Sequence, residues 1–275
     1  MAQSMASNIY DFWFPRKTTE ISIVTSQENA GKRSIDAITT SETYSFLDNV
    51  GDKDALLDTG MFLSRHYPKA RIRRLFPREF NDRDDSASNL VVIGGPINNS
   101  LCKRLMSALD SQVSYSPSTG SMKVSDVQYD CVHDDKNGMQ KDYGYFAAFP
   151  NRLNKANRVV LMSGITTFGV VGAFKAFSDL MLSKLNFDTI RSITGRNQGS
   201  VSFECFFEVA VHNCGLLDCT KVLIDYPSVG ADQAFAINAE DGKSIRSEPS
   251  RVIVGPTRSK VSATASSRIR DLLDR

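Results

Sequence analysis

Apolar residues gather into short continuous runs between polar stretches, a pattern typical of strands buried on both faces of a parallel sheet. The clearest runs are residues 21–25 (ISIVT), 90–93 (LVVI) and 158–162 (RVVLM). A polar turn and a stretch with helical spacing of apolar residues follow them. This order of strands and helices predicts a layered α/β domain with right-handed crossovers.

Helix boundaries are predicted from capping residues and proline. Thr39 and Glu42 have capping-box spacing, which indicates a helix that begins near them. A second helix is expected over residues 54–67, with Pro68 after its end. Two further helices are expected to follow buried strands, one capped by Asn98 or Asn99 and a long one capped by Thr166 or Thr167 and reaching about Leu185.

The remaining segments complete the predicted sheet. Alternating arginines make residues 71–75 an edge-strand candidate. Residues 111–142, rich in Ser, Asp, Lys and Gly, are interpreted as an insertion with a β-hairpin that can act as a lid. Residues 143–149 read as a strand joined to 158–162 by a polar turn, and residues 201–211 alternate between two faces. The run at 221–226 is expected to pair with 201–211 as an antiparallel hairpin.

The predicted fold class is therefore α/β: a Rossmann-like layered sheet, mostly parallel, with helices on both faces and a C-terminal antiparallel β-hairpin extension. Residues 1–18 form an N-terminal aromatic arm, residues 19–255 a single domain, and the Ser/Thr/Ala-rich residues 256–275 a flexible tail. The arm carries Tyr10, Phe12, Trp13 and Phe14. Either these aromatic side chains pack on the domain's own surface, or they contact a second subunit or a partner protein.

Composition limits the function classes. A length of 275 residues with 41% hydrophobic residues can bury a substantial core, and a net charge of +2 gives no case for nucleic acid or a membrane as partner. The odd number of cysteines, 5, and the lack of a signal-peptide pattern indicate free thiols in a reducing compartment, hence a cytoplasmic protein. The apolar stretch over residues 159–185 is interrupted by Lys175 and Asp179 and predicts buried strand and helix rather than a membrane span.

Two glycine-bearing turns between strand and helix are the predicted ligand site. Ligands of open α/β sheets bind beyond the carboxyl ends of strands, where glycine permits close approach and a helix N-terminus favours an anion. Ordinary chain punctuation is the alternative interpretation, because neither turn fits a Walker loop or a dinucleotide fingerprint. The candidate ligand-binding residues are Gly94, Gly95, Asn98, Asn99, Ser100, Ser163, Gly164, Thr166, Thr167 and Gly169.

The motifs VVIGGPINNS and MSGITTFGVVGAF resemble, over residues 20–185, the Rossmann-like nucleotide-binding superfamily called SLOG. That superfamily includes cytokinin-activating phosphoribohydrolases and sensors of nucleotide-derived signals. In its enzymes the second turn is Pro-Gly-Gly-x-Gly-Thr followed by Glu, whereas here only Gly164, Thr167 and Gly169 match and no glutamate follows. The resemblance implies nucleotide binding and does not extend to N-glycosidic hydrolysis.

Groups for catalysis or metal binding are few. His212, Cys214 and Cys219 have no evident fourth ligand, so no metal site is predicted. Glu28, in the loop with Lys32 and Arg33, and Glu204 are the catalytic candidates, although Glu204 on a half-exposed sheet is expected to face solvent.

The predicted function is the binding or sensing of a nucleotide or a nucleotide-derived phosphorylated metabolite, with no other cofactor. The alternatives are a nucleoside- or nucleotide-directed hydrolase or transferase on the same scaffold, and a structural or protein-interaction subunit. A homo-oligomer formed through the aromatic arm belongs to the last alternative.

Overall fold

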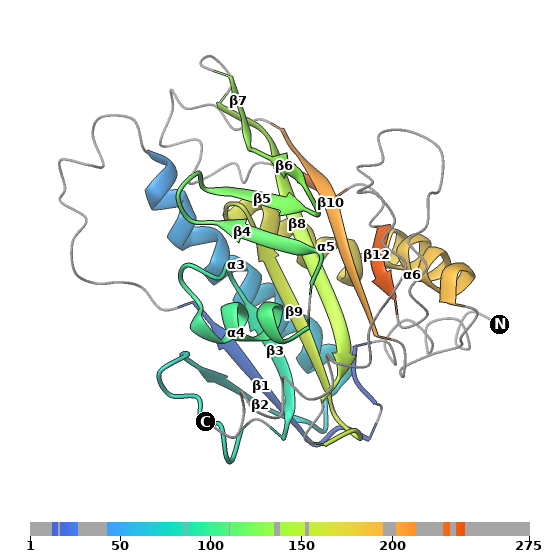
Figure 1. Ribbon diagram of the computed structural model, residues 1–275. Coiled ribbons are helices and arrows are strands. Elements are labelled where there is room, and N and C mark those ends of the chain that lie inside the picture. Colours follow the sequence, from blue (N-terminus) through green and yellow to red (C-terminus); the bar gives the residue numbers. More distant parts are fainter. Residues whose placement is uncertain are drawn as a thin grey trace.

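A computed structural model describes residues 13–15, 17–26, 43–85, 87–109, 111–134, 138–151, 154–194, 202–212, 228–231 and 235–239. Its centre is a mixed sheet with the strand order β11-β10-β8-β9-β3-β1-β2, in which β12 also pairs with β10 and β7 with β8 (Figure 1). The strands of this sheet are β1 (Glu20–Thr25), β2 (Arg71–Leu75), β3 (Asn89–Ile93), β7 (Val132–Asp134), β8 (Gly138–Pro150), β9 (Arg158–Gly164), β10 (Phe203–His212), β11 (Ser228–Ala231) and β12 (Phe235–Ala239).

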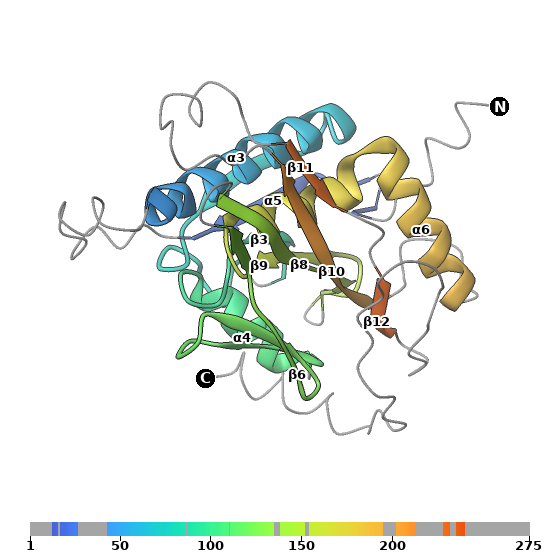
Figure 2. The same ribbon diagram turned by 90° about the horizontal axis from the view of Figure 1, so that it is seen from above.

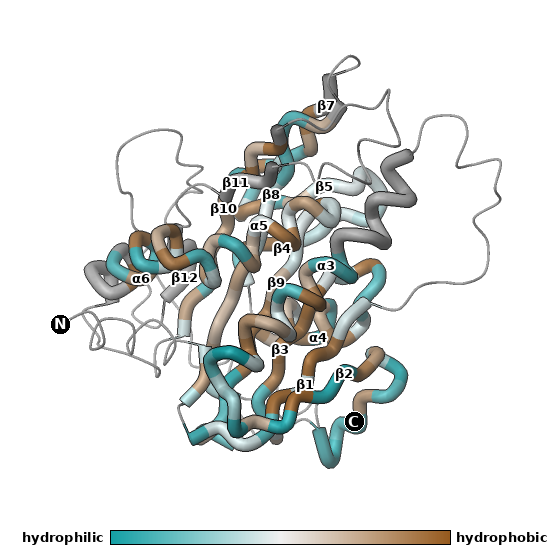
Figure 3. Tube along the Cα trace, turned by 180° about the vertical axis from the view of Figure 1, so that it is seen from behind, coloured by the Kyte–Doolittle hydropathy of each residue, from teal (hydrophilic) through white to brown (hydrophobic). Residues whose placement is uncertain are grey.

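The parallel half of the sheet consists of β2, β1, β3 and β9. All residues of β3 and β9 are buried, as predicted from their continuous apolar runs. Strand β2 is an edge strand in the described sheet, also as predicted. Figure 3 shows the contrast, with hydrophobic β1 and β3 inside the sheet and hydrophilic residues in β2 at its edge.

The other half of the sheet is antiparallel. Strand β8 pairs with β9, and β10 pairs with β8 from Phe203 opposite Ala148 to Ala210 opposite Lys141. The predicted alternation of β10 is confirmed, because Phe203, Cys205, Phe207, Val209 and Val211 share one core and Phe206 belongs to the other. The segment predicted to form a hairpin with β10, residues 221–226, lies outside the described residues.

Helices cover both faces of the sheet, which confirms the α/β layering (Figure 2). Helices α3 (Thr43–His66) and α5 (Thr167–Ser178) pack on one face. Helix α4 (Ser100–Ala108) packs on the other, together with a separate three-stranded antiparallel sheet of β4 (Val113–Ser116), β5 (Ser121–Val124) and β6 (Val127–Tyr129). This small sheet has one strand more than the hairpin predicted for residues 111–142.

Two helix predictions are wrong. The two helices expected between residues 39 and 67 are, within the described residues, one continuous helix, α3, because burial of Ala55, Phe62 and Leu63 holds it on the sheet. The long helix expected to reach Leu185 ends at Ser178. Asp179 is extended there, and its Oδ1 accepts hydrogen bonds from Met181 N and Leu182 N at the start of α6 (Leu180–Thr194).

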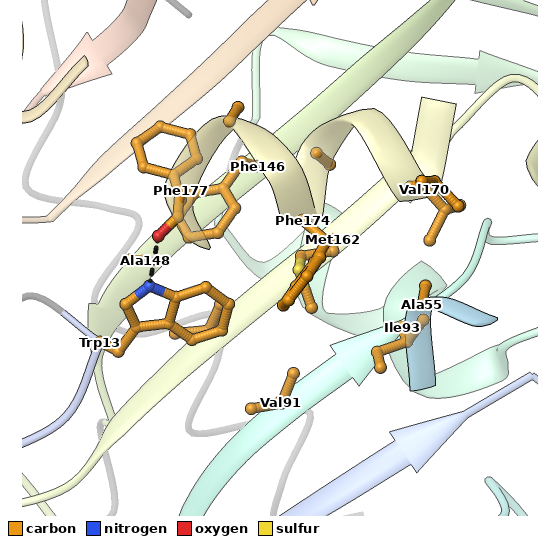
Figure 4. Packing of buried hydrophobic residues seen from close by; sticks show 14 of the residues in the cluster. Trp13, Ala55, Val91, Ile93, Phe146, Ala148, Met162, Val170, Phe174 and Phe177 are labelled. Carbon is orange, nitrogen blue, oxygen red and sulfur yellow. Dashed lines mark hydrogen bonds between the residues drawn. The ribbon is translucent and has the colours of Figure 1, made fainter. Parts of the chain in front are cut away.

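The described part of the aromatic arm belongs to the core. Trp13 and Phe14 are fully buried, and Trp13 Nε1 donates a 2.8 Å hydrogen bond to Phe177 O (Figure 4). The Trp13 ring packs against Phe62, Phe146 and Phe174. These two side chains are therefore not available to a partner protein, whereas Tyr10 and Phe12 lie outside the described residues.

Candidate functional site

Three parallel strands end side by side at one edge of the sheet. Ser26 N, just after β1, donates a 3.2 Å hydrogen bond to Ile93 O at the end of β3. Gly94 N in turn donates a 3.0 Å hydrogen bond to Met162 O in β9. The chain order places β2 outside β1 and β9 on the far side of β3, so the strand order reverses between β1 and β3. In open α/β sheets such a reversal point is where ligands bind.

The two glycine turns predicted from the sequence lie next to each other at this edge. A Cβ atom built on Gly95 would lie 3.5 Å from Gly164 O and 3.8 Å from Ser163 Oγ. Gly94 has a φ of 104°, a conformation that favours glycine. A side chain there would overlap Ser26 Oγ and come within 2.9 Å of Asp52 Oδ2. The hydroxyl of Ser26 and the carboxyl of Asp52 therefore lie directly against the backbone of Gly94.

Asp52 is the main residue of this edge that the sequence prediction missed. It lies in α3 and is half-buried, and burial raises the pKa of its carboxyl above the ordinary value, although a hydrogen bond with Ser26 opposes the shift. Its signal in the sequence is weak, because it resembles the acids Asp54 and Asp58 farther along the same helix. A carboxyl in this position can bind ligand hydroxyl groups or donate a proton.

Asn99 has a structural role at the first turn. Its Oδ1 accepts hydrogen bonds from Leu101 N at 3.1 Å and Cys102 N at 3.2 Å, which caps α4. Its Nδ2 donates to Val24 O at 3.2 Å and Ile93 O at 3.0 Å. The fully buried Asn99 thus joins the ends of β1 and β3 to α4, while the neighbouring side chains of Asn98 and Ser100 are exposed.

The N-terminus of α5, at the second turn, already holds a carboxylate of the chain. Asp142 in β8 is fully buried and accepts hydrogen bonds from Thr166 Oγ1 at 2.6 Å, Thr166 N at 3.2 Å and Gly169 N. Burial raises the pKa of Asp142, and these hydrogen bonds oppose the rise. The N–H groups expected to remain open for a ligand are therefore bonded within the chain.

The glycines of the second turn allow close packing. A Cβ atom on Gly164 would lie only 2.6 Å from Gly169 Cα, so the strand end and the first turn of α5 touch through their backbones. Thr166 rather than Thr167 caps the helix, through its Oγ1 and Phe168 N at 3.3 Å. The hydroxyl of Thr167 is buried and has no hydrogen-bond partner among the described residues.

Thiol chemistry is disfavoured at this edge. Cys102, beside Ser163, is fully buried, and burial raises the pKa of its thiol to about 12. At neutral pH the group is a protonated thiol, which is a poor nucleophile.

The expectation that Glu204 faces solvent is wrong. The side chain is buried, and its Oε2 accepts hydrogen bonds from Ser111 Oγ at 2.5 Å and Tyr145 Oη at 2.7 Å. Its Oε1 accepts a 3.1 Å hydrogen bond from Gln112 N. The carboxylate thus joins residues 111 and 112, just before the small sheet, to strands β8 and β10 of the main sheet. Both carboxylate oxygens accept hydrogen bonds from the chain, and a catalytic role for Glu204 stays a prediction.

Other residues of the predicted site lie outside the described residues. These are Glu28, Lys32, Arg33, Cys214 and Cys219. Within the ranges that the structure describes, no group of three His, Cys, Asp or Glu residues is arranged to hold a metal ion. None of the described helices combines the length and apolar character needed to cross a membrane.

Comparisons of the chain with protein-family models, with curated proteins and with solved structures find no match.

Proposed function

We propose that the protein binds a nucleotide or a nucleotide-derived phosphorylated metabolite at the carboxyl edge of β1, β3 and β9. The observation that carries the proposal is the placement of Ser26 and Asp52 against Gly94 where the strand order reverses. A hydroxyl and a carboxyl side by side match the donors and acceptors of sugar hydroxyl groups. The absence of a side chain at Gly94 is what lets Ser26 and Asp52 lie against the backbone at this edge.

The capping of α4 and α5 limits which part of the edge can bind the phosphate and which can bind the sugar. Asn99 and Asp142 use the first N–H groups of α4 and α5, so the ligand's phosphate is not bound by these backbone groups. The sugar hydroxyls are assigned to Asp52 and Ser26. This arrangement is a variant of the Rossmann-like plan that the SLOG resemblance implies, with a ribose-binding acid taken from α3.

Thermal-shift screening against nucleotides, cyclic nucleotides and sugar nucleotides tests the proposal. At least one compound is expected to stabilise the wild type, and Asp52→Asn should weaken that compound's binding about tenfold, as expected for loss of a hydrogen bond to a charged group. Asp58→Asn is the matched control, because Asp58 is an exposed acid of the same helix. A folded wild type that no compound stabilises, or an Asp52→Asn variant that binds normally, contradicts the proposal.

A catalytic version of the same site is the second candidate. Burial raises the pKa of Asp52, and a raised carboxyl pKa favours the protonated form that a general acid needs. On this hypothesis the protein is a nucleoside- or nucleotide-directed hydrolase or transferase, and Asp52 replaces Glu28 and Glu204 as the proton donor. Product analysis with a stabilising nucleotide separates the two candidates. Turnover that Asp52→Asn abolishes supports the enzyme, and an unchanged nucleotide supports the sensor.

We further propose a cytoplasmic location, because Cys102 and Cys205 are buried cysteines without a disulfide, as is usual in a reducing compartment.

A further inference from the structure

The edge strand β2 and the turn after it form a strongly basic segment. Between residues 65 and 78 the chain carries Arg65, Lys69, Arg71, Arg73, Arg74 and Arg78. The exposed members are Arg65, Lys69, Arg71, Arg74 and Arg78. Because the whole chain has a net charge of only +2, this segment concentrates positive charge locally.

Arginines of this region differ in how their charge is balanced. Arg73 pairs with Asp85 and with Glu20, and Arg104 on α4 pairs with Asp82. In contrast, Arg74 and Arg78 have no carboxylate partner among the described residues. The guanidinium carbon of Arg74 lies 4.3 Å from the centre of the Phe76 ring, and that of Arg78 lies 5.7 Å from it.

Two hydrogen bonds close the turn after β2 that carries Phe76. Phe76 N donates a 2.8 Å hydrogen bond to Glu79 Oε2, and Glu79 N donates a 2.9 Å hydrogen bond to Phe76 O. A guanidinium stacked on an aromatic face keeps its N–H groups free at the rim, where they can bind a phosphate in a bidentate manner. Both guanidinium groups lie near the same ring, which brings two positive charges to the turn after β2.

This site lies at the same edge of the sheet as Ser26 and Asp52. Strand β2 is parallel to β1, with Leu75 opposite Val24. Phe76 therefore follows β2 at the level where β1 ends, one strand spacing of about 4.8 Å from β1. A ligand whose hydroxyls contact Asp52 can extend across the end of β1 towards Arg74 and Arg78.

We infer that Arg74 and Arg78, held on Phe76, bind the phosphate groups of the ligand at this edge. The inference rests on the proposed function for the identity of the ligand as a nucleotide. The phosphate contact itself depends only on the arginine pair. The two arginines supply the positive charge that the capped N-termini of α4 and α5 do not offer.

Isothermal titration of the full chain with tripolyphosphate tests the arginine pair without a nucleotide. The wild type should bind saturably, and the double variant R74A/R78A should bind about tenfold or more weakly, the loss expected when charge-assisted hydrogen bonds are removed. The matched control is K69A/R71A, which removes the same charge from exposed side chains at the opposite, amino end of β2. Its affinity should stay within about twofold of the wild type, because the distance along β2 and solvent screening weaken its contribution.

Three results overturn the inference: no saturable binding by the wild type, undiminished binding by R74A/R78A, and an equal loss in both double variants, which indicates non-specific attraction. Parallel titrations with a stabilising nucleotide and with its nucleoside separate this inference from the proposed function. Binding of tripolyphosphate through the two arginines without any nucleotide binding leaves the phosphate site standing and refutes the proposed function. Nucleotide binding that R74A/R78A does not weaken refutes the phosphate site and leaves the proposed function standing.

Discussion

Replacement of Asn99 by alanine tests whether this residue holds the edge together or waits for a ligand. The loss of the helix cap costs about 0.5–2 kcal/mol. The loss of the two hydrogen bonds from Nδ2 to Val24 O and Ile93 O costs about 0.5–1.5 kcal/mol each. The free energy of unfolding should therefore fall by about 1.5–5 kcal/mol, measured as a lower urea midpoint at constant slope.

Two further variants separate the contribution of the helix cap to stability from that of the contacts with the strands. Asn99→Ser retains a cap but not the contacts with the strands, so it should recover about 1 kcal/mol relative to Asn99→Ala. Asn98→Ala removes an exposed amide one residue away and should change stability by less than about 0.5 kcal/mol. The reasoning is refuted if Asn99→Ala costs less than about 1 kcal/mol, or if the Asn98 control costs as much.

Three other changes have defined outcomes. Glu204→Gln should destabilise the fold by about 1–3 kcal/mol and increase amide exchange in β4, β5 and β6, because an amide cannot accept all three hydrogen bonds. The control Glu208→Gln breaks a partly exposed ion pair with Lys141 and should lower stability by about 1 kcal/mol or less. An equal loss of stability in the two variants would contradict this prediction. Burial raises the pKa of Asp52 in the folded protein, so the stability that its neutral form contributes is fully present below pH 3.8 and is lost as the pH rises through the folded-state pKa. Asp52→Asn should therefore have a higher melting temperature than the wild type at pH 7, and the difference between the two melting temperatures should narrow towards pH 3.8. A difference in melting temperature that does not depend on pH would exclude this account. Burial raises the pKa of Cys102 to about 12 and that of Cys205 well above its ordinary value, so iodoacetamide at pH 8 should label neither thiol in the native protein and both in urea, as mass spectrometry can show; native labelling of either would disprove their burial.

Local patterns in the sequence were enough for much of the sheet. Residues 90–93 and 159–162 are all apolar and all buried, so these runs predict β3 and β9 without tertiary information. Asparagine and threonine are favoured helix caps, and Asn99 and Thr166 cap α4 and α5. Adjacent parallel strands then bring the two glycine turns together.

The chemistry of the edge depends on contacts between distant segments. Asp142 looks like a solvated acid in a polar stretch, but β8 delivers it to the N-terminus of α5, 24 residues away at Thr166. Asp52 likewise looks like any acid of a surface helix until α3 places it against Gly94. For Trp13 the sequence leaves open packing on the domain or contact with a partner, and the fold decides for packing, with the ring against Phe62, Phe146 and Phe174.

The most direct test of the proposed site is hydrogen–deuterium exchange of the full chain with and without a saturating nucleotide chosen by thermal shift. If the ligand binds at the carboxyl edge, protection should increase in the peptides that contain Ser26, Asp52 and residues 74–78, and in the turn at Gly94. Protection confined to the opposite, amino edge of the sheet, or no change at any of these four segments, would contradict the account.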